Sequence, residues 1–190
     1  MLSKKPKILI IGKGRHGKDT VAEILLELTD LKFTSSSWFL AEIIFEQFGG
    51  YSVYPSVEDC FNDRHNHREE WFNFVRAYNQ GDESRLAQEI LTVSDVYVGL
   101  RSLVEFQAAR HLFDFIFYVE ASKRVDYVDE TFEIPLDRQM IVIANNSTLE
   151  DLKHQVKIAS EIVQGKANLL SVDPGNWRLK RLLQTKAPWE

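Results

Sequence analysis

The amino-acid sequence predicts an α/β fold in which a parallel sheet carries helices on both faces. Short aliphatic runs recur along the chain and alternate with segments whose apolar residues repeat at helical spacing. The first run, at residues 7–11, stops at a glycine-rich loop, and a helical pattern follows that loop directly. Such alternation is typical of parallel strands joined by crossover helices. We therefore expect three layers, with a small helical insert.

The first predicted strand and helix flank this loop. Residues 7–11 form a continuous aliphatic run, as expected of a strand buried on both faces. Val21, Ile24, Leu25 and Leu28 fall on one face of the following helix.

The next part of the chain, about residues 38–93, reads as the helical insert. A helix beginning near Trp38 ends at a pair of glycines, and a loop rich in turn-forming residues then extends to about residue 66. Two further helices are expected, around residues 71–78 and 83–92. The aromatic residues of the first of these repeat at helical spacing, which we interpret as core packing.

In the second half of the chain, strands and helices alternate. Strands are predicted at residues 96–98, 113–119 and 140–144. Helices are predicted at residues 103–111 and from about 148 to 164, and Ser147 with Glu150 has the spacing of a capping box at the start of the second. Between the last two strands, residues 120–135 are polar and irregular. A short closing helix is compatible with the positions of Leu179, Leu182 and Leu183.

Length and composition favour one folded domain spanning residues 1–190. The chain is 44% hydrophobic with a formal charge of −5, so it has apolar material for a core and lacks the cationic surface that general nucleic-acid binding needs. Cys60 is the only cysteine, which excludes an internal disulfide, and it is expected to be a small, partly buried apolar residue. The apolar runs are too short for a signal segment or a membrane span. We expect a cytoplasmic protein that binds neither nucleic acid nor membrane.

Residues 12–18 read Gly-Lys-Gly-Arg-His-Gly-Lys and match the spacing of the Walker A motif, or P-loop. Glycines let the backbone curl so that successive N–H groups face a phosphate, and the following helix N-terminus adds unpaired N–H groups. Lys18 is placed to reach the β- and γ-phosphates as a mobile charge. Together these features predict the three-layer fold of P-loop NTPases. The residues expected to bind ATP are Gly12, Gly14, Arg15, His16, Gly17, Lys18, Asp19 and Thr20.

The residue after the lysine departs from the usual pattern. That position normally holds a serine or threonine whose hydroxyl binds Mg²⁺, but here it is Asp19, and the hydroxyl follows one residue later in Thr20. Two interpretations remain open. Either Asp19 is a direct or water-bridged Mg²⁺ ligand, or it is an acid that stabilises the first helical turn while Thr20 contacts a phosphate.

Three segments carry a further resemblance, namely residues 12–20, 95–105 and 145–152. The first looks like the Gly-Lys-Asp-Thr variant of the loop found in bacteriophage deoxynucleoside monophosphate kinases; a related loop occurs in animal-type phosphomevalonate kinases. The second resembles the phage family's strand that ends in an arginine and continues to a helical glutamate. The third resembles its last strand-to-helix junction.

The resemblance implies phosphoryl transfer from ATP to a deoxynucleoside monophosphate, with Mg²⁺ as cofactor. Lys18 and Arg15 would hold and neutralise the transferring group, and Arg101 and Glu105 would lie beside the acceptor. The residues implied to flank the donor adenine are Asn145, Asn146 and Ser147. A phage-encoded chain would act in the host cytoplasm, and a homodimer is left open.

One position departs from the phage family, which often has an acid where this chain has Gly99. The metal-binding role of that acid is then left to Asp19 or Asp95. Asp95 precedes its strand and therefore lies at the wrong end of it.

Other arginines offer candidates for phosphate contacts. Arg64 and Arg68 lie four residues apart and would clamp the acceptor phosphate from one helix face if the helix begins early; the alternative is a solvated helix start. Arg124, and after it Arg138, are candidates for a catalytic arginine on a lid at about residues 120–138 that excludes water. Ordinary surface charge is the alternative for these two.

The leading functional hypothesis is an enzyme that transfers a phosphoryl group from ATP to a nucleoside monophosphate. Two alternatives remain, a kinase of another small phosphorylated metabolite and a non-catalytic nucleotide-binding module. Turnover of a panel of acceptors separates the first two, and ATP binding without turnover would favour the third.

Overall fold

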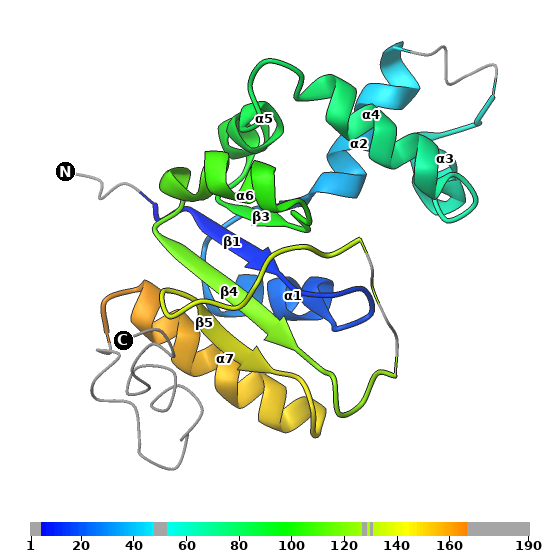
Figure 1. The fold of residues 1–190 in the computed structure, drawn as a ribbon. Coiled ribbons are helices and arrows are strands. Elements are labelled where there is room, and N and C mark those ends of the chain that lie inside the picture. Colours follow the sequence, from blue (N-terminus) through cyan, green and yellow to red (C-terminus); the bar gives the residue numbers. More distant parts are fainter. Residues whose placement is uncertain (1–4, 48–52, 127–128, 130, 167–190) are drawn as a thin grey trace, which may run out of the picture.

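The computed structural model describes residues 5–47, 53–126, 129 and 131–166, and in this part the chain folds around one parallel sheet (Figure 1). The sheet has five strands in the order β2-β3-β1-β4-β5, and every pairing between neighbours is parallel. The strands are β1 (Ile8–Ile11), β2 (Phe33–Ser35), β3 (Val96–Val98), β4 (Phe115–Glu120) and β5 (Ile141–Ala144). The predicted parallel α/β fold is confirmed.

Strand β1 lies in the middle of the sheet, and its side chains are apolar on both faces. All four of its residues are completely buried. Ile8 and Ile10 belong to one apolar cluster, whereas Leu9 and Ile11 belong to a second cluster on the opposite face. This division follows from the alternation of side chains along a strand.

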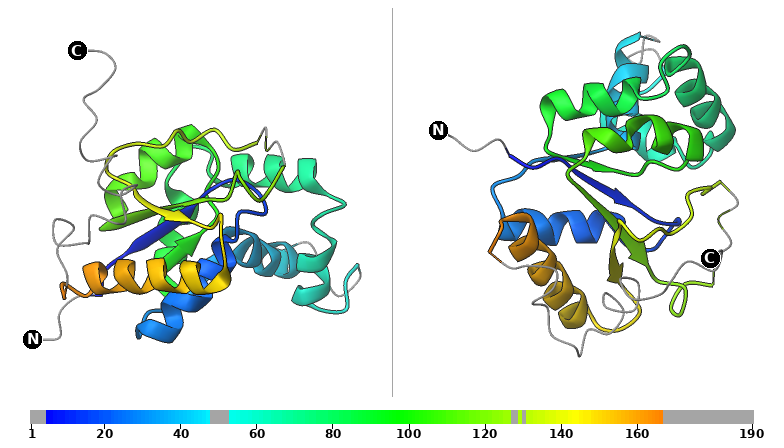
Figure 2. Two further views of the ribbon diagram at one scale, coloured as in Figure 1. Left: turned by 90° about the horizontal axis from the view of Figure 1, so that it is seen from below. Right: turned by 60° about the vertical axis from the view of Figure 1, so that its left-hand side comes forward.

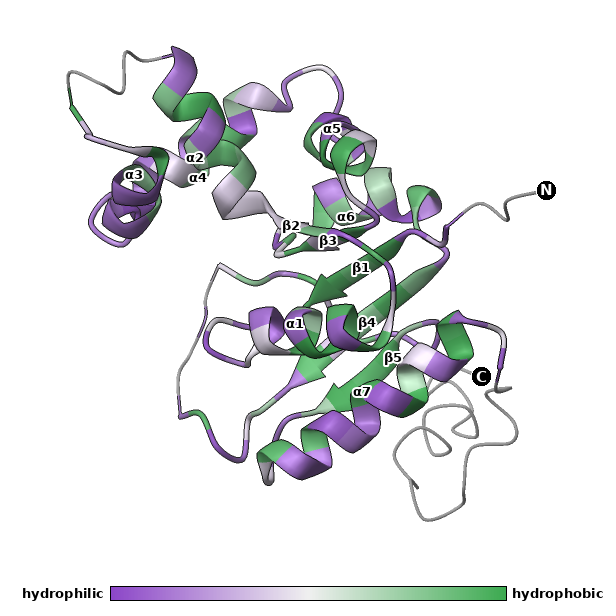
Figure 3. Cartoon of the chain, turned by 180° about the vertical axis from the view of Figure 1, so that it is seen from behind, coloured by the Kyte–Doolittle hydropathy of each residue, from purple (hydrophilic) through white to green (hydrophobic). Residues whose placement is uncertain are grey.

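Helices cover both faces of the sheet, which makes the three layers (Figure 2). On one face, α1 (Lys18–Leu28) and α7 (Leu149–Val163) supply apolar side chains to the cluster around Ile8. On the other face, α5 (Arg85–Val93) and α6 (Leu103–Ala109) pack on the cluster around Leu9. A short 3₁₀ helix, Arg110–Leu112, follows α6. Figure 3 shows apolar strands enclosed by helices that are hydrophilic in part.

Helices α2 to α4 extend from the edge strand β2 to one side of the sheet (Figure 1). They are α2 (Ser36–Gln47), α3 (Val57–Asp63) and α4 (Arg68–Tyr78). Trp38 on α2 meets the ring of Phe61 on α3 edge-on, with ring centroids 5.3 Å apart. The predicted aromatic stripe of α4 is half-buried against the cluster around Leu9. Cys60, for which partial burial was expected, is buried.

Two elements were not predicted from the sequence. Strand β2 has only three residues, all half-buried, so it shows neither a continuous apolar run nor clear alternation. Helix α3 lies where a loop was expected, and it is largely hydrophilic (Figure 3). Ser56 begins this helix, since its hydroxyl accepts a hydrogen bond from the N–H of Asp59 at 3.1 Å. A cap rather than a periodic apolar face therefore marks α3.

The start of α7 lies one residue later than predicted. Thr148, not Ser147, is the capping residue, and Asp151, not Glu150, completes the capping box. The Thr148 hydroxyl accepts from the N–H of Asp151 at 3.2 Å, and the Asp151 carboxylate accepts from the N–H of Thr148 at 3.3 Å. Aspartate performs the role usually assigned to glutamate at this position. The predicted helix around Leu179 lies outside the described residues.

None of the described helices is both long enough and apolar enough to cross a lipid bilayer.

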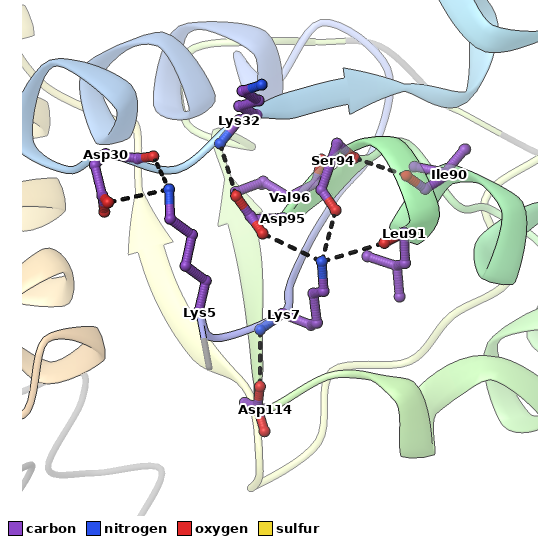
Figure 4. A network of polar contacts seen from close by, with 10 residues as sticks. All are labelled: Lys5, Lys7, Asp30, Lys32, Ile90, Leu91, Ser94, Asp95, Val96 and Asp114. Carbon is purple, nitrogen blue, oxygen red and sulfur yellow. Dashed lines mark hydrogen bonds and ion pairs between the residues drawn. The ribbon is translucent and has the colours of Figure 1, made fainter. Parts of the chain in front are cut away.

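A network of polar contacts fixes the amino ends of the strands, opposite to the glycine-rich loop (Figure 4). The Lys7 ammonium donates to the carbonyl oxygens of Leu91 and Ser94, at 3.2 and 2.9 Å, and to the Asp95 carboxylate at 3.2 Å. The N–H of Lys7 donates to the Asp114 carboxylate at 2.8 Å. Asp95 is thus engaged at the amino edge of the sheet, remote along its strand from the loop that follows β1.

We expect Lys7→Met to lower the free energy of unfolding by about 1–3 kcal/mol, because it leaves partly buried acceptors without their donor. Urea denaturation followed by circular dichroism would measure the change. The matched control is Lys5→Met, since Lys5 pairs with Asp30, whose side chain is 84% exposed, and exposed pairs contribute little. Equal stabilities for the two variants would contradict a structural role for the Lys7 network.

Candidate functional site

The glycine-rich loop, residues 12–17, lies tightly against the carboxyl ends of the neighbouring strands. Gly12 has φ +149°, and a Cβ added there would lie 2.4 Å from the carbonyl oxygen of Val119 on β4. Gly17 has φ +88°, and a Cβ there would lie 2.5 Å from the side-chain nitrogen of Asn145 after β5. Only glycine fits these two positions, because both the backbone angle and the space exclude a side chain.

The loop also has the backbone geometry of an anion site. Arg15 is the one described non-glycine residue with positive φ, at 63°. A left-handed residue between right-handed neighbours turns successive N–H groups to one side. Gly17 is the N-cap of α1 and has no side chain to satisfy the N–H groups of the first turn. These groups and the helix dipole favour a bound anion.

Lys18 begins α1 and folds back over the loop. Its ammonium group donates to the carbonyl oxygens of Gly12 and Lys13, both at 2.9 Å. Burial, followed by the positive charge of Arg101, lowers the pKa of Lys18 to about 8. A partly buried cation beside a second cation is unfavourable by itself, and an anion between them would relieve the repulsion.

Arg101 follows the carboxyl end of β3 and is linked to the loop by an acid, Asp129, that no sequence pattern singles out. Its guanidinium donates to the Asp129 carboxylate at 2.7 Å and to the Thr131 hydroxyl at 2.8 Å. The same Asp129 oxygen accepts the N–H of Gly14 at 2.6 Å. Burial alone would raise the pKa of Asp129, but hydrogen bonds from Thr131 and Gly14 and the charge of Arg101 hold it below its ordinary value.

Nothing in the sequence distinguishes Asp129 from the other acids of the irregular segment. Asp126, Glu130 and Glu133 are close by in the chain, and no motif or periodicity selects one of them. The contact with Gly14 joins residues 115 positions apart. Only the tertiary structure brings this carboxylate to the loop.

The side chain of His16, predicted to bind ATP, faces the sheet. The ring is buried, and its Nδ1 lies 3.2 Å from the carbonyl oxygen of Val119 and 3.1 Å from the N–H of Ala121. A neutral ring either donates to Val119 or accepts from Ala121 at this nitrogen. Burial lowers the pKa of His16. The imidazole thus ties the loop to the end of β4, and the ATP-binding prediction remains for the main chain of this residue.

Asn145 and Asn146 also hold the loop and its surroundings. The Asn145 amide donates to the carbonyl oxygen of His16 at 2.9 Å. The Asn146 amide donates to Glu120, and its oxygen accepts the N–H of Lys123 at 2.8 Å. Both side chains therefore have structural partners beside the loop. Their predicted place beside adenine stays a prediction.

A group of arginines lies where the turn between α3 and α4 approaches the loop. The pKa of His65 is lowered first by the charge of Arg64, then by slight burial, and then by the charges of Arg68 and Arg15. Arg64 also interacts electrostatically with the carboxylate of Asp19. The three arginines from two separate segments are therefore electrostatic neighbours.

The geometry of the predicted arginine clamp differs from the expectation. Arg64 is the C-cap of α3 and Arg68 is the first residue of α4, so they do not share a helix face. The Arg64 guanidinium lies over the ring of Phe61, 3.7 Å from its centroid, and donates to the Phe61 carbonyl at 2.6 Å. The turn between the two helices, rather than one helical repeat, brings both charges together.

Gly99 and Glu105 lie close to Arg101 in the sequence, one before it and one after it. Gly99 has φ +117°, a backbone angle that strains any other residue, and a Cβ there would lie 2.8 Å from the Ser36 hydroxyl, which would have to turn away. Glu105 is buried and accepts a hydrogen bond from the Asn79 amide at 3.1 Å. Burial raises its pKa to about 7. Arg101 thus faces the loop, while Glu105 contacts the start of α5 through Asn79.

The segment predicted as a lid is packed on the protein over part of its length. Ile134 is buried, and Phe132 meets the ring of Tyr118 edge-on, with ring centroids 5.9 Å apart. Arg124 is exposed, and its Nε donates to the carbonyl oxygen of Asn145 at 3.2 Å. Arg138 is exposed as well. Of these two arginines, the structure brings Arg124 beside the residues that support the loop.

Comparison with known proteins supports the fold and leaves the activity open. No protein-family model matches the sequence, and no curated protein matches it. The solved structure of TT1252 from Thermus thermophilus is similar, with a TM-score of 0.50 and 19% identity over 87% of this chain and 100% of that one. A sugar kinase from Janibacter sp. HTCC2649 gives a TM-score of 0.41 and 13% identity over 90% and 100% of the two chains.

The likeness to TT1252, at this identity, concerns the fold alone. Together with the strand order, it supports the three-layer α/β fold, and the loop between β1 and α1 is consistent with the P-loop NTPase type. Neither of these two structures is a phage deoxynucleoside monophosphate kinase. That resemblance stays a prediction.

We expect His16→Asn to flatten the dependence of stability on pH. The folded protein keeps His16 neutral with a pKa below 6.5, so stability is present above that pH and is lost as the pH falls through the folded-state value. Asparagine retains an acceptor for Ala121 but does not titrate. Urea denaturation at pH 7.5, 6.5 and 5.5 would show a steeper loss for the original chain, whereas parallel curves would contradict this role.

Proposed function

We propose that the protein is an ATP-dependent phosphotransferase whose loop, residues 12–17, holds the phosphates of ATP. The observation that carries this proposal is that Lys18, which donates to the Gly12 carbonyl, and Arg101, which shares the Asp129 carboxylate with the N–H of Gly14, meet at the open N-terminus of α1. Two cations beside unpaired N–H groups form a site for a multiply charged anion. A triphosphate supplies that charge, and the glycines allow its close approach.

The acceptor is a nucleoside monophosphate. Its phosphate is held by Arg64 and Arg68, with Arg101 between the donor and acceptor phosphates, because in-line transfer requires cations on the acceptor side as well as on the donor side. Arg64 and Arg68 come from the α3–α4 turn of the insert, and Arg101 follows the carboxyl end of β3. The helices at about residues 38–93 thus form the acceptor region.

Phosphoryl transfer in this site depends on the positions of donor and acceptor and on the neutralisation of charge. Lys18 and Arg15 neutralise the phosphoryl group as it moves from donor to acceptor, and Arg124 closes on it from the segment at about residues 120–138. Asp19 in the first turn of α1 is exposed and Thr20 is half-buried beside it, a donor set that fits Mg²⁺, which commonly takes one or two protein oxygens together with phosphate oxygens. Bound there, Mg²⁺ would neutralise charge on the β- and γ-phosphates.

A non-catalytic nucleotide-binding module is the second candidate. Gly99 favours it, because this position, which follows β3, holds a glycine and no acid that would support the metal. Such a module would bind ATP through the same loop without turning over an acceptor.

We expect purified protein with ATP and Mg²⁺ to convert at least one deoxynucleoside monophosphate of a panel into its diphosphate, measured by chromatography. Lys18→Ala should lower kcat by about a hundredfold or more while the fold is kept, because its charge acts on the transferring group. The control is Lys157→Ala, since Lys157 has an exposed side chain on α7, outside the loop. Turnover of sugar or metabolite acceptors alone would refute the nucleotide assignment, and ATP binding without any turnover would favour the second candidate.

We expect the affinity for ATP to fall as the pH rises above about 8, where free Lys18 loses its proton. The bound phosphates favour the charged form, so binding takes up a proton there and Kd rises by up to about tenfold per pH unit. Phosphate itself is fully ionised in this range. Calorimetry between pH 7 and 9.5 would show this slope in the original chain and a flatter one in Lys18→Arg, whose guanidinium stays charged.

A further inference from the structure

Asp129 occupies the place where a phosphate oxygen would be expected. Its carboxylate binds the N–H of Gly14, which belongs to the phosphate loop, and the guanidinium of Arg101, at 2.6 and 2.7 Å. Its charge also reaches Lys18. A main-chain N–H, an arginine and a nearby lysine are the partners that a phosphate takes in proteins. Here an acid of the same chain has these partners.

The N–H of Gly14 cannot bind the Asp129 carboxylate and a phosphate at the same time. A main-chain N–H carries one hydrogen and donates a full hydrogen bond to one acceptor. While Asp129 accepts that hydrogen, a phosphate oxygen cannot accept it too. Two anions at the same N–H would also repel each other in a site where the Asp129 side chain is only 3% exposed.

Arg101 is held by the same carboxylate. Its guanidinium donates to Asp129 and to Thr131, and the Thr131 hydroxyl in turn donates to Asp129 at 2.7 Å. Departure of the carboxylate from both Gly14 and Arg101 would leave Arg101 with one neutral partner, the Thr131 hydroxyl. Its charge would then be available to a phosphate.

The residues that follow Asp129 in the chain are held by contacts of their own. The N–H of Glu133 donates to the carbonyl oxygen of Arg101 at 3.0 Å, and the Glu133 carboxylate accepts the N–H of Leu103 at 3.1 Å. Ile134 is buried in the core. These contacts do not involve Asp129, so displacement of its carboxylate leaves them in place.

We infer that Asp129 is an internal competitor for the phosphate site, which a phosphate of the bound nucleotide displaces from Gly14 and Arg101. This inference rests on the proposed function, because it takes the loop to be the triphosphate site. The free protein thus keeps its cations neutralised, and binding transfers Arg101 from a carboxylate to a phosphate. The affinity for nucleotide is lower than the loop and the cations alone would give.

Asp129→Ala tests the competition, with tripolyphosphate as the probe because it lacks a base and a sugar. The matched control is Asp126→Ala, which removes the same charge from an exposed side chain three residues earlier. Calorimetry should show that Asp129→Ala binds tripolyphosphate about tenfold or more tightly than Asp126→Ala, since a charged hydrogen bond no longer has to be broken. Asp129→Asn keeps the size of the side chain and an acceptor without charge, and should fall between the two; it replaces the alanine variant if that variant fails to fold.

A second experiment tests whether Arg101 exchanges the Asp129 carboxylate for a phosphate. Arg101→Ala is made both in the original chain and in Asp129→Ala, and the affinity for tripolyphosphate is measured in each. The loss of affinity should be severalfold larger in the Asp129→Ala background, where Arg101 gives up no partner when phosphate binds. Equal losses in the two backgrounds would overturn the transfer.

The remaining outcomes separate this inference from the proposed function. If the original chain binds tripolyphosphate and Asp129→Ala binds no more tightly than Asp126→Ala, the competition is refuted and the phosphate site stands. Weaker binding by Asp129→Ala would refute it as well and would place Asp129 among the groups that build the site. If none of the folded proteins binds tripolyphosphate or ATP, both the inference and the proposed function fail.

Discussion

The close approach between the glycine-rich loop and the carboxyl ends of β4 and β5 is the constraint on which the site depends. Gly12 lies against the carbonyl of Val119, and Gly17 lies against Asn145, with no space for a side chain at either position. His16 and Asn145 then join the loop to the sheet through buried hydrogen bonds. A loop held in this way presents its N–H groups without having to be ordered by a ligand, which reduces the entropy cost of binding.

Charge in the site is balanced within the chain. Burial disfavours the charged form of Lys18, and the positive charge of Arg101 adds to this effect, so that the pKa of Lys18 is lowered. Asp129 offsets part of the repulsion through its contact with Arg101. The same arrangement that would attract a polyphosphate therefore has an anion of its own, as expected where buried charges are stable only when paired. Loop, arginine and acid together form one electrostatic unit.

The parallel topology explains how distant segments meet in this unit. In a parallel sheet, the carboxyl ends of all strands lie along one edge, and ligands bind where connections leave that edge in opposite directions. Here β1 lies between β3 and β4, so the loop after β1 lies between Arg101 after β3 and the segment that follows β4. The opposite edge is closed by Lys7 and its acceptors, which leaves it a structural role (Figure 4).

The sequence by itself determined the central strand, the glycine-rich loop and the helix after it, because a buried aliphatic run, glycines at fixed spacing and an apolar helical stripe are local patterns with local causes. It also indicated Lys18, through the spacing of the glycine-rich loop, and Arg101, through the family resemblance of residues 95–105. It missed β2 and α3, where an edge position and a polar surface leave no periodic signal. It did not show that the ring of His16 packs on the sheet. Only the tertiary structure selected Asp129, since a contact between residues 115 positions apart depends on the path of the whole chain and leaves no trace in local spacing.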